Sequence, residues 1–282
     1  MKYYHVDVFS DKPYSGNGLT VFTDTKGLQK SAMQTITQEM RQFESIFLEQ
    51  LDENAFRAYI FTMEEELDFA GHPLIGAAAL LHDLYSGEKE KDDWTLQLNS
   101  KSVEISTVRH ENYYSAQMNQ GKAEFGNILS ENQENDFLSY FGFSKDDKAF
   151  DLPLQVISTG LRYLILPVKP DALSKTKVTV PDLSVKLEEI GAKFFYVLDV
   201  EGLQGRTWDN FGFVEDIATG SAAGPAGAYL VKNKLASVDK EIILRQGDFL
   251  SRPSRMHVFV SNSGDIFVAG DVCKVATGEL LT

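Results

Sequence analysis

Two segments of small residues that follow predicted strands constrain the fold of this chain more than any other feature. The first, DFAGHPLIGAAALL, spans residues 68–81, and the second, ATGSAAGPAGAYL, spans residues 218–230. Each is typical of a tight turn that leads into a helix, and we expect these helices at residues 74–85 and 225–233. A helix of small and apolar residues on most of its sides is normally buried inside a domain.

The two segments are related by an offset of 149 residues, which superposes Gly71 on Gly220 and His72 on Ser221. Predicted strands precede and follow both segments in the same order. The repeated order predicts an α+β fold with two pseudo-symmetric lobes. Each lobe is expected to be a curved, β-barrel-like sheet around a central helix.

The boundary between the lobes is predicted from a loss of periodicity. Residues 119–135 are rich in Asn, Gln, Gly and Glu and follow neither a strand nor a helix pattern. The N-terminal lobe is therefore expected at residues 1–118 and the C-terminal lobe at residues 119–267.

Charge and hydropathy exclude several classes of partner. The net charge is −14 and the pI is about 4.8, whereas nucleic acids and anionic membranes require basic patches. No apolar run approaches the roughly 18 residues of a membrane span, and the polar N-terminal segment does not resemble a signal peptide. We expect a cytoplasmic protein that binds neither nucleic acid nor a membrane.

The sequence also lacks the usual signals for a cofactor. Cys273 is the one cysteine, so neither an intrachain disulfide nor a thiolate metal cluster can form. The five histidines show no metal-binding spacing, and GSAAGPAG fits neither a dinucleotide nor a phosphate-loop pattern. We expect no metal and no other cofactor.

The two turns have the chemistry of an anion site. The first N–H groups of a helix attract a carboxylate, and small residues let the ligand approach the backbone. Two such turns that face one cleft would bind a carboxylate with His72 and Ser221 beside it. The alternative is that both turns only allow close packing of helix against sheet, but the presence of a pair favours the binding site.

Two carboxylates have positions that suit proton transfer. Glu44 interrupts the apolar run of FESIFL; a buried carboxyl group there would serve as a general acid–base, whereas a half-buried strand could equally place it on a polar face. Asp216 lies just before the second turn and could either cap the helix or transfer protons.

Several motifs along nearly the whole chain resemble those of the PhzF-like family of isomerases, whose fold is similar to diaminopimelate epimerase. They are SGNGLTVF, FESIFL, LDFAGHPLIGAA, ISTGLRYLILPV, VEDIATGSAAG, RQGDFLSRPS and VAGDVCKVATGEL. The resemblance implies that residues 268–282 complete the N-terminal lobe and that the active site lies between the lobes. It implies a cofactor-free isomerisation of trans-2,3-dihydro-3-hydroxyanthranilate or a related small carboxylate. Homodimers are common among such relatives, so a homodimer is expected.

The resemblance also assigns roles to individual residues. Glu44 is the implied acid–base group, and His72 and Asp216 are the implied catalytic partners. Four further positions are implied to bind the substrate: Asn17, Gly71, Gly220 and Ser221.

Three other functions fit the sequence less well. A small-molecule binding or regulatory protein on the same scaffold is the main alternative, although it would not need Glu44. A metal-dependent hydrolase is disfavoured by the absence of ligand spacing. An epimerase with two opposed cysteine bases is excluded because the chain has one cysteine.

Overall fold

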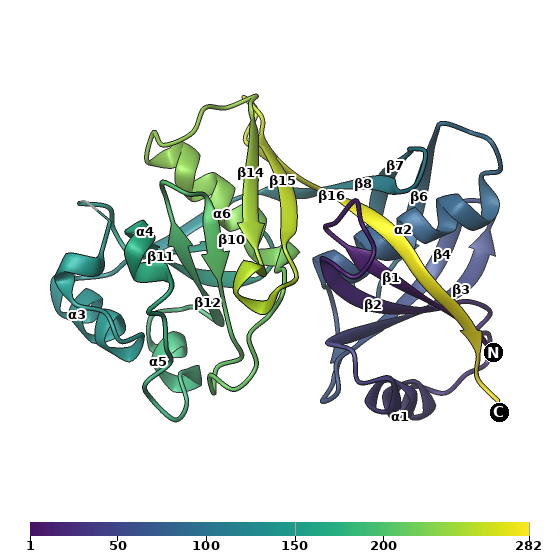
Figure 1. The fold of residues 1–282 in the computed structure, drawn as a ribbon, viewed down its shortest axis with the longest axis horizontal. Coiled ribbons are helices and arrows are strands. Elements are labelled where there is room, and N and C mark those ends of the chain that lie inside the picture. The colour runs from purple at the N-terminus through teal and green to yellow at the C-terminus, as the bar shows by residue number, and fades with distance from the viewer. Residues whose placement is uncertain (150, 282) are drawn as a thin grey trace. The chain divides into compact units, whose positions relative to one another are not determined.

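The computed structural model describes residues 1–149 and 151–281; Phe150 and Thr282, which fall within the predicted lobes, lie outside the described residues. The fold is α+β, as predicted (Figure 1). The chain divides into two compact units. Unit 1 comprises Met1–Asn119, Ser251–Arg255 and Ala269–Thr282, and unit 2 comprises Gln120–Leu250 and Met256–Val268.

Unit 1 is built on a sheet that closes on itself. Its strands follow the order β1-β2-β3-β4-β6-β7-β8-β16, and β1 also pairs with β16 in antiparallel fashion. The first and last strands of the chain therefore lie side by side (Figure 1). The strands are β1 (Lys2–Val8), β2 (Asn17–Phe22), β3 (Glu44–Asp52), β4 (Ala55–Phe61), β6 (Lys91–Gln97), β7 (Ser102–Arg109), β8 (Tyr114–Lys122) and β16 (Asp265–Glu279), with the short β5 (Glu66–Leu67) beside β4.

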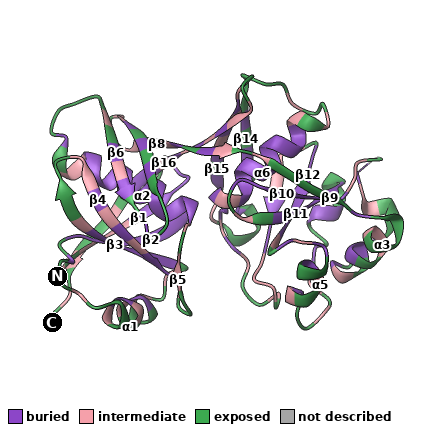
Figure 2. Cartoon of the chain, turned by 180° about the vertical axis from the view of Figure 1, so that it is seen from behind, coloured by how far each residue is buried: buried purple, intermediate pink, exposed green. Residues whose placement is uncertain are grey.

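The helix α2 (Gly71–Tyr85) is surrounded by this sheet and packs against β1, β2, β3, β6 and β7. Every residue from Gly71 to His82 is buried, and Figure 2 shows this burial along the helix. The helix comes very close to the strands at Gly76, where a Cβ atom would lie 2.6 Å from Leu19 Cδ2 and 2.8 Å from Val8 Cγ2. Small residues in this segment therefore permit the close packing of helix and sheet.

A second helix, α1 (Lys30–Met40), covers the opposite face of the same strands. Met33 packs there against Phe22, Phe47 and Phe61, which come from β2, β3 and β4. The rings of Phe22 and Phe47 stack with centroids 4.5 Å apart. Strands β2 and β3 are thus covered on both faces, and the residues of β2 are all buried.

Unit 2 repeats the pairing pattern of unit 1. The pairs β10–β11, β11–β12, β12–β13 and β13–β14 are antiparallel, parallel, antiparallel and parallel. The pairs β1–β2, β2–β3, β3–β4 and β4–β6 follow the same sequence of directions. The strands of the unit 2 pairs are β10 (Gln155–Ser158), β11 (Arg162–Val168), β12 (Phe194–Asp199), β13 (Gln204–Arg206) and β14 (Glu241–Gln246); β9 (Glu124–Ile128) and β15 (Ser254–Val260) also belong to this sheet.

The central helix of unit 2, α6 (Gly220–Lys232), packs against β10, β11 and β12. Both central helices begin at the two glycines that the repeat superposes, Gly71 and Gly220. The predicted starts at residues 74 and 225 are therefore too late by three and five residues. A proline usually marks the first turn of a helix, but Pro225 lies inside α6.

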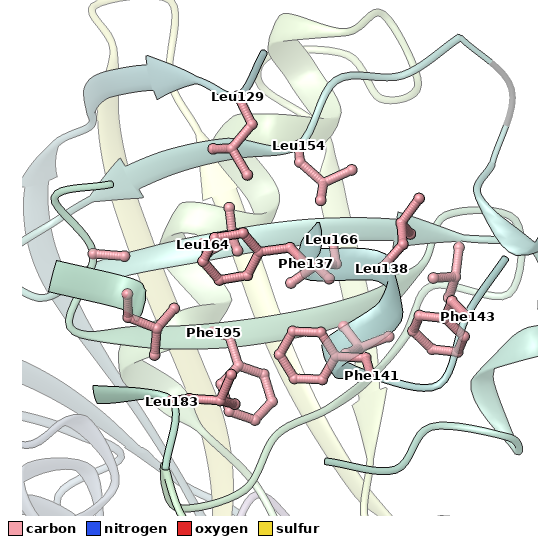
Figure 3. Close-up of a cluster of buried hydrophobic side chains, with 14 of the residues drawn as sticks. Leu129, Phe137, Leu138, Phe141, Phe143, Leu154, Leu164, Leu166, Leu183 and Phe195 are labelled. Atoms are coloured by element: carbon pink, nitrogen blue, oxygen red, sulfur yellow. The ribbon is translucent and has the colours of Figure 1, made fainter. Parts of the chain in front are cut away.

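Three further helices cover the other face of the unit 2 sheet: α3 (Glu131–Tyr140), α4 (Pro170–Leu173) and α5 (Ser184–Glu189). The hydrophobic core between them and the sheet is shown in Figure 3. Phe137 and Leu138 of α3 point into it together with Leu164 of β11 and Phe195 of β12. This core occupies the place in unit 2 that the α1 core has in unit 1.

No helix in the described part of the chain is long and apolar enough to cross a membrane.

Candidate functional site

Glu44 is the first residue of β3 and lies opposite Leu19 of the parallel strand β2. Residues 44–48 are all buried, and Glu44 itself is 7% exposed. Glu44 therefore does not lie on a solvent-exposed polar face of the strand. A carboxylate in such a place needs a polar partner.

The partner of Glu44 is His72, the second residue of α2. Glu44 Oε2 lies 3.0 Å from His72 Nδ1, and His72 is 4% exposed. A buried carboxylate at this distance from an imidazole is well placed to take part in proton transfer.

The start of α2 has the features of an anion-binding helix end. Its N-cap residue is Ala70, which has no side-chain oxygen to accept a hydrogen bond from the first turn, and the first turn holds no acidic residue. The partial positive charge of the helix N-terminus at Gly71 is thus not neutralised by a side chain of that turn.

Asn17 begins β2 and is 1% exposed. The loop before it is fixed by Arg252, which donates hydrogen bonds to the carbonyl oxygens of Gly16 (2.7 Å) and Ser15 (3.0 Å) and to the Asp7 carboxylate (2.7 Å). Gly16 has a φ of 70°, which favours glycine. The RQGDFLSRPS motif, far along the sequence, therefore sets the position of Asn17.

In unit 2, Asp216 is 8% exposed and accepts a hydrogen bond of 2.5 Å from the hydroxyl of Thr219, the N-cap residue of α6. Gln246 is fully buried; its Nε2 donates to the Asp216 carbonyl (2.8 Å) and to Thr219 Oγ1 (3.1 Å). Its Oε1 accepts the Thr219 N–H (3.2 Å) and the Tyr196 hydroxyl (3.2 Å). Burial, with Asp216 nearby, raises the pKa of Tyr196, so this hydroxyl stays protonated and donates.

Ser221 is the second residue of α6 and has the place that His72 has in α2. Its Oγ lies 2.7 Å from the hydroxyl oxygen of Tyr163 on β11. The carbonyl of Gly220 accepts a hydrogen bond of 3.0 Å from Gln120 Nε2. The first turn of α6 is thus held by polar side chains from two strands.

The two units differ in the residue that begins the second strand of their first parallel pair. Glu44 at the start of β3 lies opposite Leu19 of β2, and Phe194 at the start of β12 lies opposite Tyr163 of β11. Strand β12 thus begins with an apolar ring, whereas β3 begins with the Glu44 carboxylate. The scaffold is pseudo-symmetric, but the acidic group of this strand position belongs to unit 1.

The structure groups the predicted site residues by unit. Glu44 and His72 are in contact in unit 1, where Asn17 and Gly71 also lie. Asp216, Gly220 and Ser221 lie in unit 2, around the start of α6. Sequence reasoning missed their polar neighbours, although the quoted motifs contain them: Tyr163, Thr219, Gln246 and Arg252.

Comparisons with known proteins agree with this architecture. A family model described as phenazine biosynthesis-like protein (PhzC-PhzF) matches residues 6–278. A trans-2,3-dihydro-3-hydroxyanthranilate isomerase of Pseudomonas aeruginosa is 31% identical over 297 residues, covering 99% of this chain and 98% of the relative. An uncharacterized isomerase of Pasteurella multocida is 30% identical over 282 residues, covering 99% and 93%.

Solved structures are similar over the full chain. A predicted epimerase of Pseudomonas aeruginosa has a TM-score of 0.95 and 51% identity, covering 100% of this chain and 99% of the other. A hydroxyproline epimerase of Agrobacterium vitis has a TM-score of 0.65 at 11% identity, covering 99% and 91%, and is similar in fold alone. The predicted epimerase-like fold is confirmed.

Proposed function

This chain belongs to the family of phenazine biosynthesis-like proteins and is an isomerase, and on that premise we propose that it transfers a proton between carbon atoms of a small carboxylate-bearing substrate. Glu44 is the proposed acid–base group. Dihydro-hydroxyanthranilates are the proposed substrate class, because a relative 31% identical to this chain is named for that isomerisation.

The observation that carries the proposal is the contact between Glu44 Oε2 and His72 Nδ1 at 3.0 Å, with both residues nearly inaccessible to solvent. A binding protein gains nothing from a buried carboxylate beside an imidazole, since burying a charged group is unfavourable. An isomerase needs such a group, because one base must remove a proton from one carbon and return it to another.

The proposed reaction uses Glu44 twice. In the first step the Glu44 carboxylate takes a proton from a carbon next to a conjugated double bond, and the electron pair of the C–H bond spreads over the conjugated system. In the second step the carboxyl group, whose proton has exchanged with solvent, delivers a proton to a different carbon, so that Glu44 ends as a carboxylate. His72 orients the Glu44 carboxylate and keeps it in place through both steps.

Unit 2 is proposed to supply the other groups of the site. Ser221 and the backbone at Gly71 and Gly220 would bind the substrate carboxylate, because helix starts attract anions. Asn17 would bind the substrate from unit 1, and Asp216 would be the second titratable group.

The test is solvent deuterium incorporation into trans-2,3-dihydro-3-hydroxyanthranilate, followed by mass spectrometry. We expect the wild type to incorporate deuterium and Glu44→Gln to lose this activity by about 100-fold or more, while ligand affinity changes little. Glu53→Gln is the matched control, since Glu53 is exposed in the turn between β3 and β4. A Glu44→Gln enzyme as active as the control would show that Glu44 is not the base.

A further inference from the structure

A chain of buried hydrogen bonds in unit 2 ends at the Asp216 carboxylate, and the reaction proposed above assigns no role to the residues that precede Asp216 in this chain. It runs from Tyr196 through Gln246 and Thr219 to Asp216. None of these four residues is more than 8% exposed. Such a network restricts which of its atoms can donate and which can accept.

Backbone groups fix the orientation of the Gln246 amide. The N–H of Thr219 can only donate, so the amide atom that it contacts at 3.2 Å is Oε1. The carbonyl of Asp216 can only accept, so the atom 2.8 Å from it is Nε2. The second proton of this NH₂ group then points to Thr219 Oγ1 at 3.1 Å.

The last hydrogen bond of the network joins Thr219 to Asp216. Thr219 Oγ1 accepts from Gln246 and donates its own proton to Asp216 Oδ2, the acceptor at 2.5 Å. We infer that Gln246 and Thr219 are positioning residues that hold Asp216 Oδ2 as a hydrogen-bond acceptor. A proton that Asp216 gains or loses during turnover is then carried by Oδ1. The catalytic part of this inference rests on the proposed function of Asp216.

The start of α2 shows that such a network is not needed to build this kind of helix end. At the offset of the repeat, the positions of Asp216, Thr219 and Gln246 are Leu67, Ala70 and Gln97. Ala70 has no hydroxyl group, and Gln97 is exposed, yet α2 begins at the equivalent glycine. The network in unit 2 therefore serves the carboxylate and not the helix.

The kinetic test compares Thr219→Val with Thr219→Ser in the full chain. Valine has nearly the shape of threonine but no hydroxyl group, whereas serine keeps the donor. We expect Thr219→Val to lower kcat by about 10- to 100-fold with KM within about threefold, because a misplaced group reduces the rate to this extent. Thr219→Ser should keep at least about half of the wild-type kcat. Thermal unfolding of both variants checks that they fold.

Two kinetic results would overturn the inference. One is a Thr219→Val enzyme with wild-type kcat when Asp216→Asn has lost activity. The other is an equal loss in Thr219→Val and Thr219→Ser, which would indicate a role in packing. If Asp216→Asn turns over substrate like the wild type, the proposed catalytic role of Asp216 fails instead.

A second measurement does not depend on turnover. In threonine-labelled protein, the Thr219 hydroxyl proton should exchange slowly with water and give an NMR signal that is lost in Thr219→Val and shifted in Asp216→Asn. The exposed Thr35 provides the comparison for a hydroxyl proton in fast exchange. Exchange at Thr219 as fast as at Thr35 would overturn the inference, even if no probe substrate is turned over.

Discussion

Arg252 and Asp7 form an ion pair between residues that are 245 positions apart, with a guanidinium nitrogen 2.7 Å from Asp7 Oδ1. Asp7 is 1% exposed, and its carboxylate also accepts the backbone N–H of Tyr14 at 2.6 Å. The segment Ser251–Arg255 is thereby bonded to the first strands of the chain and belongs to unit 1.

Arg252→Ala should lower the free energy of unfolding by about 3 kcal/mol, because it leaves the buried Asp7 carboxylate without its cation. Urea unfolding measures the change. Arg255→Ala is the control, since Arg255 is exposed and its loss should change stability by about 0.5 kcal/mol or less. Equal losses in the two variants would mean that the ion pair contributes nothing.

His72→Asn should lower kcat by about 100-fold or more, because asparagine can occupy the position near Glu44 but does not titrate. KM should change little, since His72 is proposed to act on Glu44 and not to bind the substrate carboxylate. Steady-state kinetics on a dihydro-hydroxyanthranilate checks both values. His257→Asn, on β15, removes a histidine from outside the proposed site and should behave like the wild type.

Ser221→Ala should weaken the binding of a carboxylate ligand by about tenfold, which is the effect of one hydrogen bond to a charged group. The amide of the same ligand should bind both proteins equally. Tyr163→Phe should have a smaller effect in the same direction, because it removes the hydroxyl that lies 2.7 Å from Ser221 Oγ. Calorimetric titration with the acid and its amide would contradict this role if both ligands lost affinity alike.

The lowered pKa of Asp147 in unit 2 predicts that the free energy of unfolding depends on pH. Hydrogen bonds from Ser144 and from Lys175 lower the pKa of Asp147 from 3.8 to about 2. A lowered pKa in the folded state stabilises the fold above pH 4, and this contribution is lost as the pH falls from about 4 to about 2. Because Asp147 is partly exposed to solvent, we expect about 1–2 kcal/mol.

Asp147→Asn should therefore be less stable than the wild type at pH 7, and the difference should shrink as the pH falls through this range. Urea unfolding at a series of pH values gives the comparison. The neighbouring Asp146 is exposed, so Asp146→Asn should change stability little at every pH. A constant difference for Asp147→Asn down to pH 2 would argue against the assigned hydrogen bonds.

Cys273 should react slowly with thiol reagents in the folded protein. Burial, with the carboxylates of Asp11 and Asp7 nearby, raises the pKa of its thiol to about 11, and the residue is 3% exposed. At pH 8 we expect alkylation by iodoacetamide to be about 100-fold slower than in urea, because the thiolate is the reactive form. Similar rates in both conditions would show that the thiol is accessible and ionised.

Much of the fold could be predicted because both copies of the repeat contain a recognisable segment of Gly and Ala residues after predicted strands. The offset of the repeat superposes Gly71 on Gly220, the residues at which both central helices begin, and the strand order around them repeats. The exact helix starts could not be predicted from proline, because Pro225 lies inside α6. Pro225 is tolerated inside α6 because the helix is buried and packed against the sheet. The residue preferences of isolated helices do not include this packing.

The site was less predictable from the residues alone. Nothing in the spacing of Glu44 and His72 indicates their contact. It depends on how the first residue of β3 meets the start of α2. Thr219 and Gln246 are 27 residues apart in sequence, and their hydrogen bonds follow from the return of β14 to the start of α6. These contacts depend on which distant segments pair in the folded protein. A single sequence shows the residues that could form such contacts but not which of them meet.

The pairing of β1 with β16 also sets an order of events during synthesis. Strands β1 and β8 leave the ribosome well before β16, which contributes the strand between them in the finished sheet. Until then both have an open edge, and open edges pair readily with other chains. Unit 1 therefore has open strand edges until β16 is synthesised, although most of it is translated first.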